Sequence, residues 1–159
     1  MVIHLYMDPF SSFQKTLLAG HLMYVANTGE DSIVEMAVDA MGNAGETHIL
    51  VNSINGPDGL IVDDNDNILV AANQSNQIIV LDPTGKATDV LGDFDGINKH
   101  GIVKGLLFPS GLVKVDKAIY ITNFAVDLDI FGLVQSYSNE YTREVKRYSI
   151  ARIKLDKDD

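Results

Sequence analysis

The sequence contains no cysteine among its 159 residues. The chain therefore has no disulfide, no thiolate nucleophile and no zinc site with sulfur ligands. It also lacks an apolar run of the roughly 18 residues that a membrane-spanning helix requires. The amino terminus, MVIHLYMDPF, lacks the basic and apolar regions of a signal peptide. These absences predict a soluble protein, and we expect it in the cytoplasm.

Basic residues are scarce, since 12 Lys and Arg stand against 22 Asp and Glu, which gives a formal net charge of -10 at pH 7. Such a charge repels phosphate backbones and anionic lipid headgroups. Nucleic acid and membranes are therefore not expected partners. The hydrophobic fraction of 46% is enough for the packed core of one domain.

The apolar runs are short, rich in Val, Ile and Leu, and separated by Gly, Asn, Asp and Pro, a pattern typical of strands and tight turns. No segment shows helical periodicity. The pattern predicts an all-β protein with strands at 2–7, 22–26, 32–38, 47–51, 59–63, 68–72, 77–81, 87–91, 111–115, 118–122 and 145–155.

The strand pattern repeats along the chain. One copy runs from Pro57-Asp58-Gly59-Leu60 to Asn73, and a later copy runs from Pro109-Ser110-Gly111-Leu112 to Asn123. An earlier copy ends at Asn27, so the three asparagines recur at intervals of 46 and 50 residues. Four antiparallel strands per repeat at this period indicate the blades of a β-propeller.

We therefore predict a single partial propeller domain over residues 1–159, with blades at approximately 12–51, 57–92 and 109–155. The third blade lacks its outermost strand. An open arc of three blades exposes apolar faces and strand edges, which soluble proteins avoid. We expect a homodimer to complete six blades, with the strand Val2–Met7 closing a blade by pairing with the edge of Val145–Leu155 in the partner.

Two long segments, 93–108 and 124–142, interrupt the repeat and are predicted to be binding loops or interface elements. The second is apolar enough to predict that it packs against another surface. His100 in the first, beside Lys99 and near Lys104, is a candidate acid or base. A solvated loop histidine is the alternative.

The stretch INGPDGLIVDDNDNILVAANQSNQIIVLDPTGKATDVLGDF resembles the blades of regucalcin, gluconolactonase and luciferin-regenerating-enzyme propellers, as do GLLFPSG, YITN and VKRYSIARIKL. The resemblance covers roughly Leu22 to Leu155. It implies the carboxy-terminal half of a six-bladed ring, with a divalent metal at the channel mouth and hydrolysis of lactones or esters.

The resemblance also implies candidate ligands. Asp58 matches the metal-binding Asp of a Pro-Asp-Gly motif. A second ligand, the Asn of an Asn-Gly pair, would fall near Ser12-Phe13, where neither residue occurs. We expect either no cofactor or a weakly bound Ca, Mg or Mn ion, since such ions require several oxygen ligands. A purely structural turn is the alternative role for Asp58.

Ser110 occupies the position of Asp58 one blade later. Ser12, Ser110, Asn73, Asn123 and His100 are the further candidates for ligand binding at the channel mouth or in loops. The repetition of Asn27, Asn73 and Asn123 favours a structural role for these residues.

The cluster at 63–67 lacks the Gly and Glu of an EF-hand and is predicted to be a turn. The sequence identifies no catalytic residue, because it has no nucleophile elbow or phosphate loop. We expect a module that binds a small molecule or assembles with protein. The alternatives are a metal-dependent lactonase or esterase and an inactive gene fragment.

Overall fold

The computed structural model of the chain describes residues 14–19, 21–127 and 140–155. Its elements form four antiparallel sheets. The first contains β1 (Gln14–Ala19), β2 (Leu22–Asn27), β3 (Ser32–Val38) and β4 (Ala44–Val51). The second contains β5 (Pro57–Val62), β6 (Ile68–Ala72), β7 (Gln77–Leu81) and β8 (Ala87–Leu91). The third contains β11 (Pro109–Val115), β12 (Ala118–Asn123) and β13 (Ile150–Lys154), and β9 (Phe94–Ile97) pairs with β10 (Val103–Gly105).

Three short 3-10 turns complete the described elements: η1 (Thr28–Glu30), η2 (Asn73–Ser75) and η4 (Glu140–Glu144). Within the described ranges, no helix is long and apolar enough to cross a membrane.

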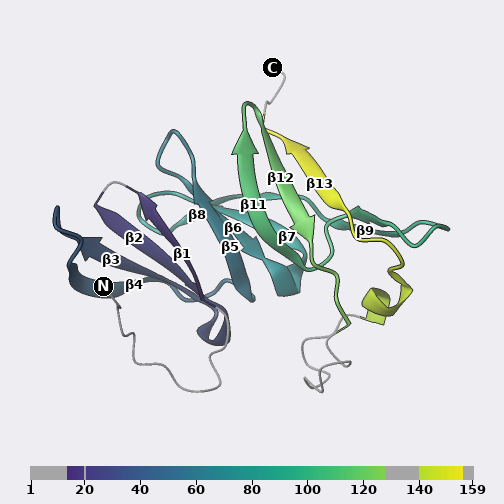
Figure 1. Ribbon diagram of the computed structural model, residues 1–159, viewed down its shortest axis with the longest axis horizontal. Helices are drawn as coiled ribbons and strands as arrows, with labels where there is room; N and C mark the ends of the chain where they lie inside the picture. Colours follow the sequence, from purple (N-terminus) through teal and green to yellow (C-terminus); the bar gives the residue numbers. More distant parts are fainter. Residues whose placement is uncertain (1–13, 20, 128–139, 156–159) are drawn as a thin grey trace.

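The three larger sheets stand side by side in chain order, and the β9–β10 hairpin lies beyond the third (Figure 1). Strand β5 contacts both β1 and β11, the first strands of the neighbouring sheets. These three strands therefore form the inner edge of the arrangement, as the first strands of propeller blades do. The all-β, partial-propeller fold predicted from the sequence is confirmed.

The sheets are joined by two apolar cores. Because side chains alternate along a strand, β6 supplies both cores and is buried along its whole length. Ile68 and Val70 face the first sheet, whereas Leu69 and Ala71 face the third. The first core also contains Tyr24, Ala26, Ile33 and Leu60, and the second contains Ile78, Leu106, Ile119 and Ile121.

Four hairpin turns share one hydrogen-bonded design. In each, the side-chain Oδ1 of an Asp or Asn accepts hydrogen bonds from the backbone N–H groups two and four residues later, and this residue is Asp39, Asp63, Asp82 or Asn98. The residue three positions later has a left-handed backbone, as at Gly85 with φ of 83°. The carboxylate of Asp63 thus organises the β5–β6 turn, so the prediction of a turn over 63–67 is confirmed.

Three strand predictions need correction. Strand β1 was not predicted, because its polar first half lacks the Pro-x-Gly opening of β5 and β11. The predicted loop 93–108 contains the β9–β10 hairpin. The strand predicted over Val145–Leu155 starts only at Ile150, since the N–H groups of Lys146 and Arg147 donate to the carbonyl oxygen of Gly101 at 2.9 and 3.1 Å.

The asparagine repeat is also offset by one residue. Strand pairing sets Pro57 opposite Ala72, and Pro109 opposite Asn123. The counterpart of Asn123 in the second sheet is therefore Ala72, and Asn73 follows it. The predicted strand Val2–Met7 lies outside the described residues, so its pairing with a partner remains a prediction.

A third, smaller core fixes the β9–β10 hairpin. Val103, Leu107 and Ala125 form it, with Val145 packed against them. The rings of Phe94 and Tyr141 lie 4.9 Å apart between centroids. The described ends of the second long loop therefore pack against the hairpin. The apolar middle of the loop, from which packing was predicted, lies outside the described residues.

Candidate functional site

The candidate site lies at the first residues of the two inner strands β5 and β11. In β5, Pro57 and Leu60 pair regularly with β6, but the two residues between them do not. In β11, Pro109 and Leu112 pair regularly with β12, and again the two residues between them do not. The residues between them, 58–59 and 110–111, therefore form β-bulges at the same place in both sheets. Bulges turn side chains out of the regular ladder and are common beside functional sites.

The two bulges lie against each other. A Cβ atom added to Gly59 would collide with the carbonyl oxygen of Ser110 and lie 3.2 Å from the Cα of Gly111. This close backbone approach brings Asp58 and Ser110 to the same end of neighbouring strands. The residue types are a half-buried carboxylate and a hydroxyl, which can bind polar groups of a ligand.

The hydroxyl of Ser110 is oriented within its own sheet. Its Oγ lies 3.0 Å from Oγ1 of Thr122, and Oγ1 of Thr122 also accepts a hydrogen bond from the N–H of Gly111 at 2.8 Å. The bulge in β11 is therefore held by a threonine of β12. Sequence reasoning missed Thr122, because the matching position in the second sheet is Ala71.

Shortly before each bulge, a backbone N–H donates a hydrogen bond to a side chain of the preceding sheet. Oδ1 of Asp31 accepts the N–H of Gly56, and Oδ1 of Asn76 accepts the N–H of Phe108, both at 2.8 Å. Asp31 and Asn76 have left-handed backbones, with φ of 50° and 59°. The signal in the sequence is an Asp or Asn four residues after the end of the second strand.

The same end of β5 receives one more contact from the first sheet. The hydroxyl of Thr28 donates a hydrogen bond to the carbonyl oxygen of Pro57 at 2.6 Å. The first sheet thus fixes the start of β5 through Asp31 and Thr28.

The two candidate asparagines are integrated into the fold. Asn123 is buried; its Oδ1 accepts the N–H of Leu107 at 3.0 Å, and its Nδ2 donates to the carbonyl of Gly105 and to Oγ of Ser149, both at 3.1 Å. Asn73 is buried too, and its N–H donates to the carbonyl of Gly56 at 2.9 Å. These contacts tie the side chain of Asn123 into the fold. The bond of Asn73 is made by its backbone, so the role of its side chain stays a prediction.

The structure does not bring His100 to the bulges. This exposed residue lies in the turn between β9 and β10, on the side of the third sheet away from β5 (Figure 1). Ser12 lies outside the described residues, and its predicted role is untested.

The register also shows which residue of β1 corresponds to Asp58 of β5. Gln14 pairs with Asn27 in the first sheet, as Pro57 pairs with Ala72 in the second. Lys15, the residue after Gln14, is therefore the counterpart of Asp58.

The described side chains do not make a metal centre by themselves. No group of three or more His, Asp or Glu that could hold an ion occurs in the described ranges. Ser110 occupies the position of Asp58 in the next repeat, and its hydroxyl is hydrogen-bonded to the hydroxyl of Thr122. Calcium prefers six to eight oxygen ligands and magnesium a nearly complete octahedron, so Asp58 with these hydroxyls does not fit either ion.

Residues 18–92 match the family described as the SMP-30/Gluconolactonase/LRE-like region. No curated protein sequence matches the chain. Among solved structures, a luciferin-regenerating enzyme matches with a TM-score of 0.61 and 17% identity, covering 83% of this chain and 40% of that protein.

Two further structures share the fold. A gluconolactonase from Xanthomonas campestris matches with a TM-score of 0.57 and 15% identity, over 83% of this chain and 39% of its own. A calcium-binding regucalcin from Agrobacterium tumefaciens matches with a TM-score of 0.54 and 16% identity, over 74% of this chain and 40% of its own. This chain thus spans about 40% of the length of these proteins. It has the propeller fold of the SMP-30/gluconolactonase/LRE-like proteins, and its sequence resembles that family over residues 18–92.

Proposed function

We propose that this chain is a binding module derived from a gluconolactonase-like propeller, which holds a small polar molecule against the inner ends of β5 and β11. The observation that carries the proposal is the pair of adjacent bulges, which set Asp58 and Ser110 at equivalent positions on neighbouring strands. A carboxylate accepts hydrogen bonds from ligand hydroxyls, and a serine both donates and accepts. A polyhydroxylated ligand suits this combination.

A metal-dependent lactone or ester hydrolase is the second candidate. Its support is the position of Asp58 in a Pro-Asp-Gly bulge together with the similarity in fold to a gluconolactonase. This reaction requires more oxygen ligands than the described residues supply, so we derive no catalytic step for it. The cytoplasmic location predicted from the sequence also stays a prediction.

Titration of gluconolactone, Ca²⁺ and Mn²⁺ separates these functions, with the thermal midpoint as the readout. A ligand that binds the native state raises this midpoint by mass action. The binding-module proposal predicts that gluconolactone stabilises the wild type without metal, and that the protein does not accelerate the spontaneous hydrolysis of the lactone. A midpoint unmoved by gluconolactone would contradict it, whereas metal-dependent release of acid from the lactone would establish the hydrolase.

Three variants locate the effect. Asp58→Asn and Ser110→Ala should each weaken the gluconolactone response by roughly tenfold, the loss expected when one buried polar contact of a ligand is removed. Asp89→Asn removes one carboxylate from the exposed strand β8 and is the matched control. Equal responses from Asp58→Asn and Asp89→Asn would show that the ligand binds elsewhere.

A further inference from the structure

The dipeptide Asn55-Gly56 is the one place in the sequence where a glycine follows an asparagine. Asparagine deamidates most readily in this context, because glycine has no side chain to hinder attack by its backbone nitrogen. Asn55 is exposed, so solvent reaches the amide group that would react. The dipeptide immediately precedes Pro57, the first residue of β5. A chemically labile site therefore lies at the entrance to the second sheet.

Deamidation at this site would proceed through a cyclic imide. The backbone nitrogen of Gly56 loses its proton and forms a bond to Cγ of Asn55. The bond between Cγ and Nδ2 then breaks, and Nδ2 leaves as ammonia after taking up a proton. Water opens the succinimide at either carbonyl group, which leaves aspartate or isoaspartate at position 55. Water is the only reagent consumed, so the reaction depends on access to the Gly56 nitrogen.

The structure covers the nitrogen that must react. The N–H of Gly56 donates a hydrogen bond to Oδ1 of Asp31 at 2.8 Å, and Gly56 is buried. A carboxylate that accepts this N–H shields its proton from a solvent base. It also disfavours the anion that the nitrogen would become, because like charges repel. Attack on Asn55 therefore requires this hydrogen bond to open first.

Backbone hydrogen bonds to the second sheet also hold both residues of the dipeptide. The carbonyl oxygen of Gly56 accepts the N–H of Asn73 at 2.9 Å, and the carbonyl oxygen of Asn55 accepts the N–H of Gln74 at 3.3 Å. Gly56 has a left-handed backbone with φ of 59°. Rotation of the peptide between Asn55 and Gly56 would break these contacts as well as the bond to Asp31.

The next repeat contains the same hydrogen bond without the labile residue. Oδ1 of Asn76 accepts the N–H of Phe108, and the residue before Phe108 is Leu107. The bond is therefore part of the way in which one sheet holds the next. In the second sheet it has the additional effect of covering a reactive nitrogen. The comparison also shows that an asparagine can act as the acceptor.

We propose that Asn55 is a deamidation site that the carboxylate of Asp31 keeps closed in the folded protein. The first sheet thereby protects the start of the second from chemical change. Isoaspartate would lengthen the backbone by a methylene group and displace Gly56 from Asp31. A chain that deamidates while it is open therefore cannot return to the same closed arrangement.

Peptide mapping by mass spectrometry tests the proposal by measuring deamidation at position 55 during incubation at mildly alkaline pH. The folded wild type should react at least roughly tenfold more slowly than the same chain in urea, because the reaction waits for local opening. Asp31→Ala should raise the rate in the folded protein by roughly tenfold or more, the factor expected for one hydrogen bond to a charged acceptor. Asp31→Asn keeps an acceptor, as at Asn76, and should remain much nearer the wild type.

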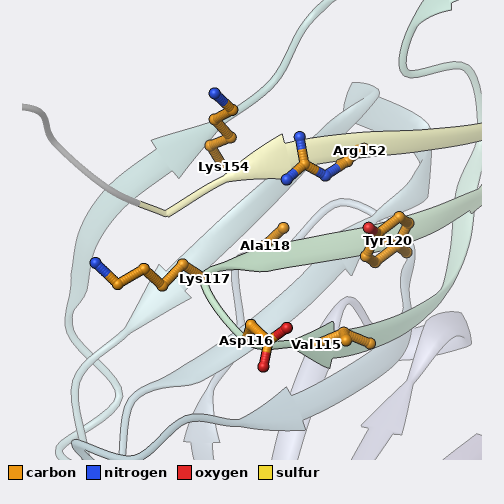
Figure 2. A pocket seen from close by; sticks show the side chains of 7 residues that line it. All are labelled: Val115, Asp116, Lys117, Ala118, Tyr120, Arg152 and Lys154. Atoms are coloured by element: carbon orange, nitrogen blue, oxygen red, sulfur yellow. The ribbon is translucent and has the colours of Figure 1, made fainter.

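Asp116→Ala is the matched control for the loss of an aspartate in a strained position. Asp116 has a left-handed backbone with φ of 51°, and Asp31 has φ of 50°. Figure 2 shows Asp116 between β11 and β12, where it lines a hollow on the third sheet. Alanine at this position causes similar backbone strain but leaves the N–H of Gly56 covered. The rate of deamidation at Asn55 should therefore stay at the wild-type value.

Thr28→Val is a second control, which removes a different contact to the same strand. It deletes the hydroxyl that donates to the carbonyl oxygen of Pro57 and should leave the rate unchanged. Equal acceleration by Asp31→Ala and by either control would overturn the proposal, because general loosening would then govern the reaction. A folded wild type that reacts as fast as the chain in urea would overturn it whether or not Asp31→Ala folds. Hydrogen exchange at Gly56 is an independent readout and should accelerate in Asp31→Ala together with deamidation.

Discussion

The carbonyl oxygen of Ser110 occupies the space that a side chain on Gly59 would need. This relationship joins the inner strands of the second and third sheets through their backbones. Strands β5 and β11 contact each other, and the bulges set how closely they can approach. The position of the candidate site therefore depends on a glycine.

Gly59→Ala should destabilise the protein by about 3 kcal/mol, the upper end of the cost of overpacking, because the atoms in the way are backbone. Gly111→Ala is the matched control. It occupies the same place in the next repeat, but its Cβ would meet Oγ1 of Thr122 at 3.1 Å, and a side chain can shift. Urea denaturation of both variants measures the difference. An equal loss of unfolding free energy in the two variants would show that β5 and β11 can move apart without destabilising the protein.

Asp63 should make stability depend on acid pH. Burial raises its pKa, but hydrogen bonds from the side chain and N–H of Asn67 and from the N–H of Asn65 outweigh burial and hold the pKa below the usual 3.8. A group with a lowered folded pKa stabilises the protein above its unfolded pKa and loses this effect as the pH falls through the folded value.

The free energy of unfolding of Asp63→Ala should therefore be about 1 kcal/mol lower than that of the wild type at pH 7, which is the usual net value of such hydrogen bonds. This difference should shrink as the pH falls below about 4. Urea titrations across this range measure it, with Asp64→Ala as the control, since Asp64 is 91% exposed and pairs with Lys114 at the surface. A gap that is independent of pH would show that the carboxylate of Asp63 does not organise the turn.

The sequence predicted the strands best where residue types alternate between clear turn signals. Strands β3, β6, β7 and β8 have the predicted bounds, because Asp, Asn and Gly turns border Val- and Ile-rich runs on both sides. The β9–β10 hairpin was missed, since Gly96 and Gly105 interrupt strands of only four and three residues. Its stability comes from contacts with Ala125 and Val145, which are remote in sequence.

The candidate site was predictable only in part. The Pro-x-Gly repeat placed Asp58 and Ser110 at the starts of equivalent strands, and the register agrees. No local sequence pattern indicated that Thr122 would orient Ser110. None indicated that the side chains of Asp31 and Asn76 would accept hydrogen bonds from the start of the next sheet. Those contacts join residues 12 to 32 positions apart, so only the packed sheets reveal them.

Asn76 should couple the second sheet to the third through the N–H of Phe108. Asn76→Ala loses this acceptor and places alanine at a φ of 59°, so about 2 kcal/mol of stability should be lost. Asn76→Asp keeps a side-chain oxygen that can accept this N–H, as Asp31 accepts the N–H of Gly56, and should lose much less stability. Hydrogen exchange at Phe108 is the direct measurement. Unchanged protection of this amide in Asn76→Ala would contradict the prediction.

Asn123 should anchor the β9–β10 hairpin to the third sheet. Asn123→Ala leaves the buried N–H of Leu107 without its acceptor, so we expect a loss of about 2 to 3 kcal/mol. Asn123→Asp keeps the acceptor but cannot donate to the carbonyl of Gly105 while it is ionised.

The defect of Asn123→Asp should therefore shrink at acid pH. Burial raises the pKa of a carboxyl group, and its protonated form can donate to Gly105 again. Parallel urea denaturation of the wild type and both variants at pH 7 and pH 5 measures this effect, and Ser149→Ala, which removes only the other acceptor of Nδ2, is the control. A loss in Asn123→Asp that does not change with pH, or a loss in Ser149→Ala as large as in Asn123→Ala, would show that the bonds to Leu107 and Gly105 do not hold the hairpin.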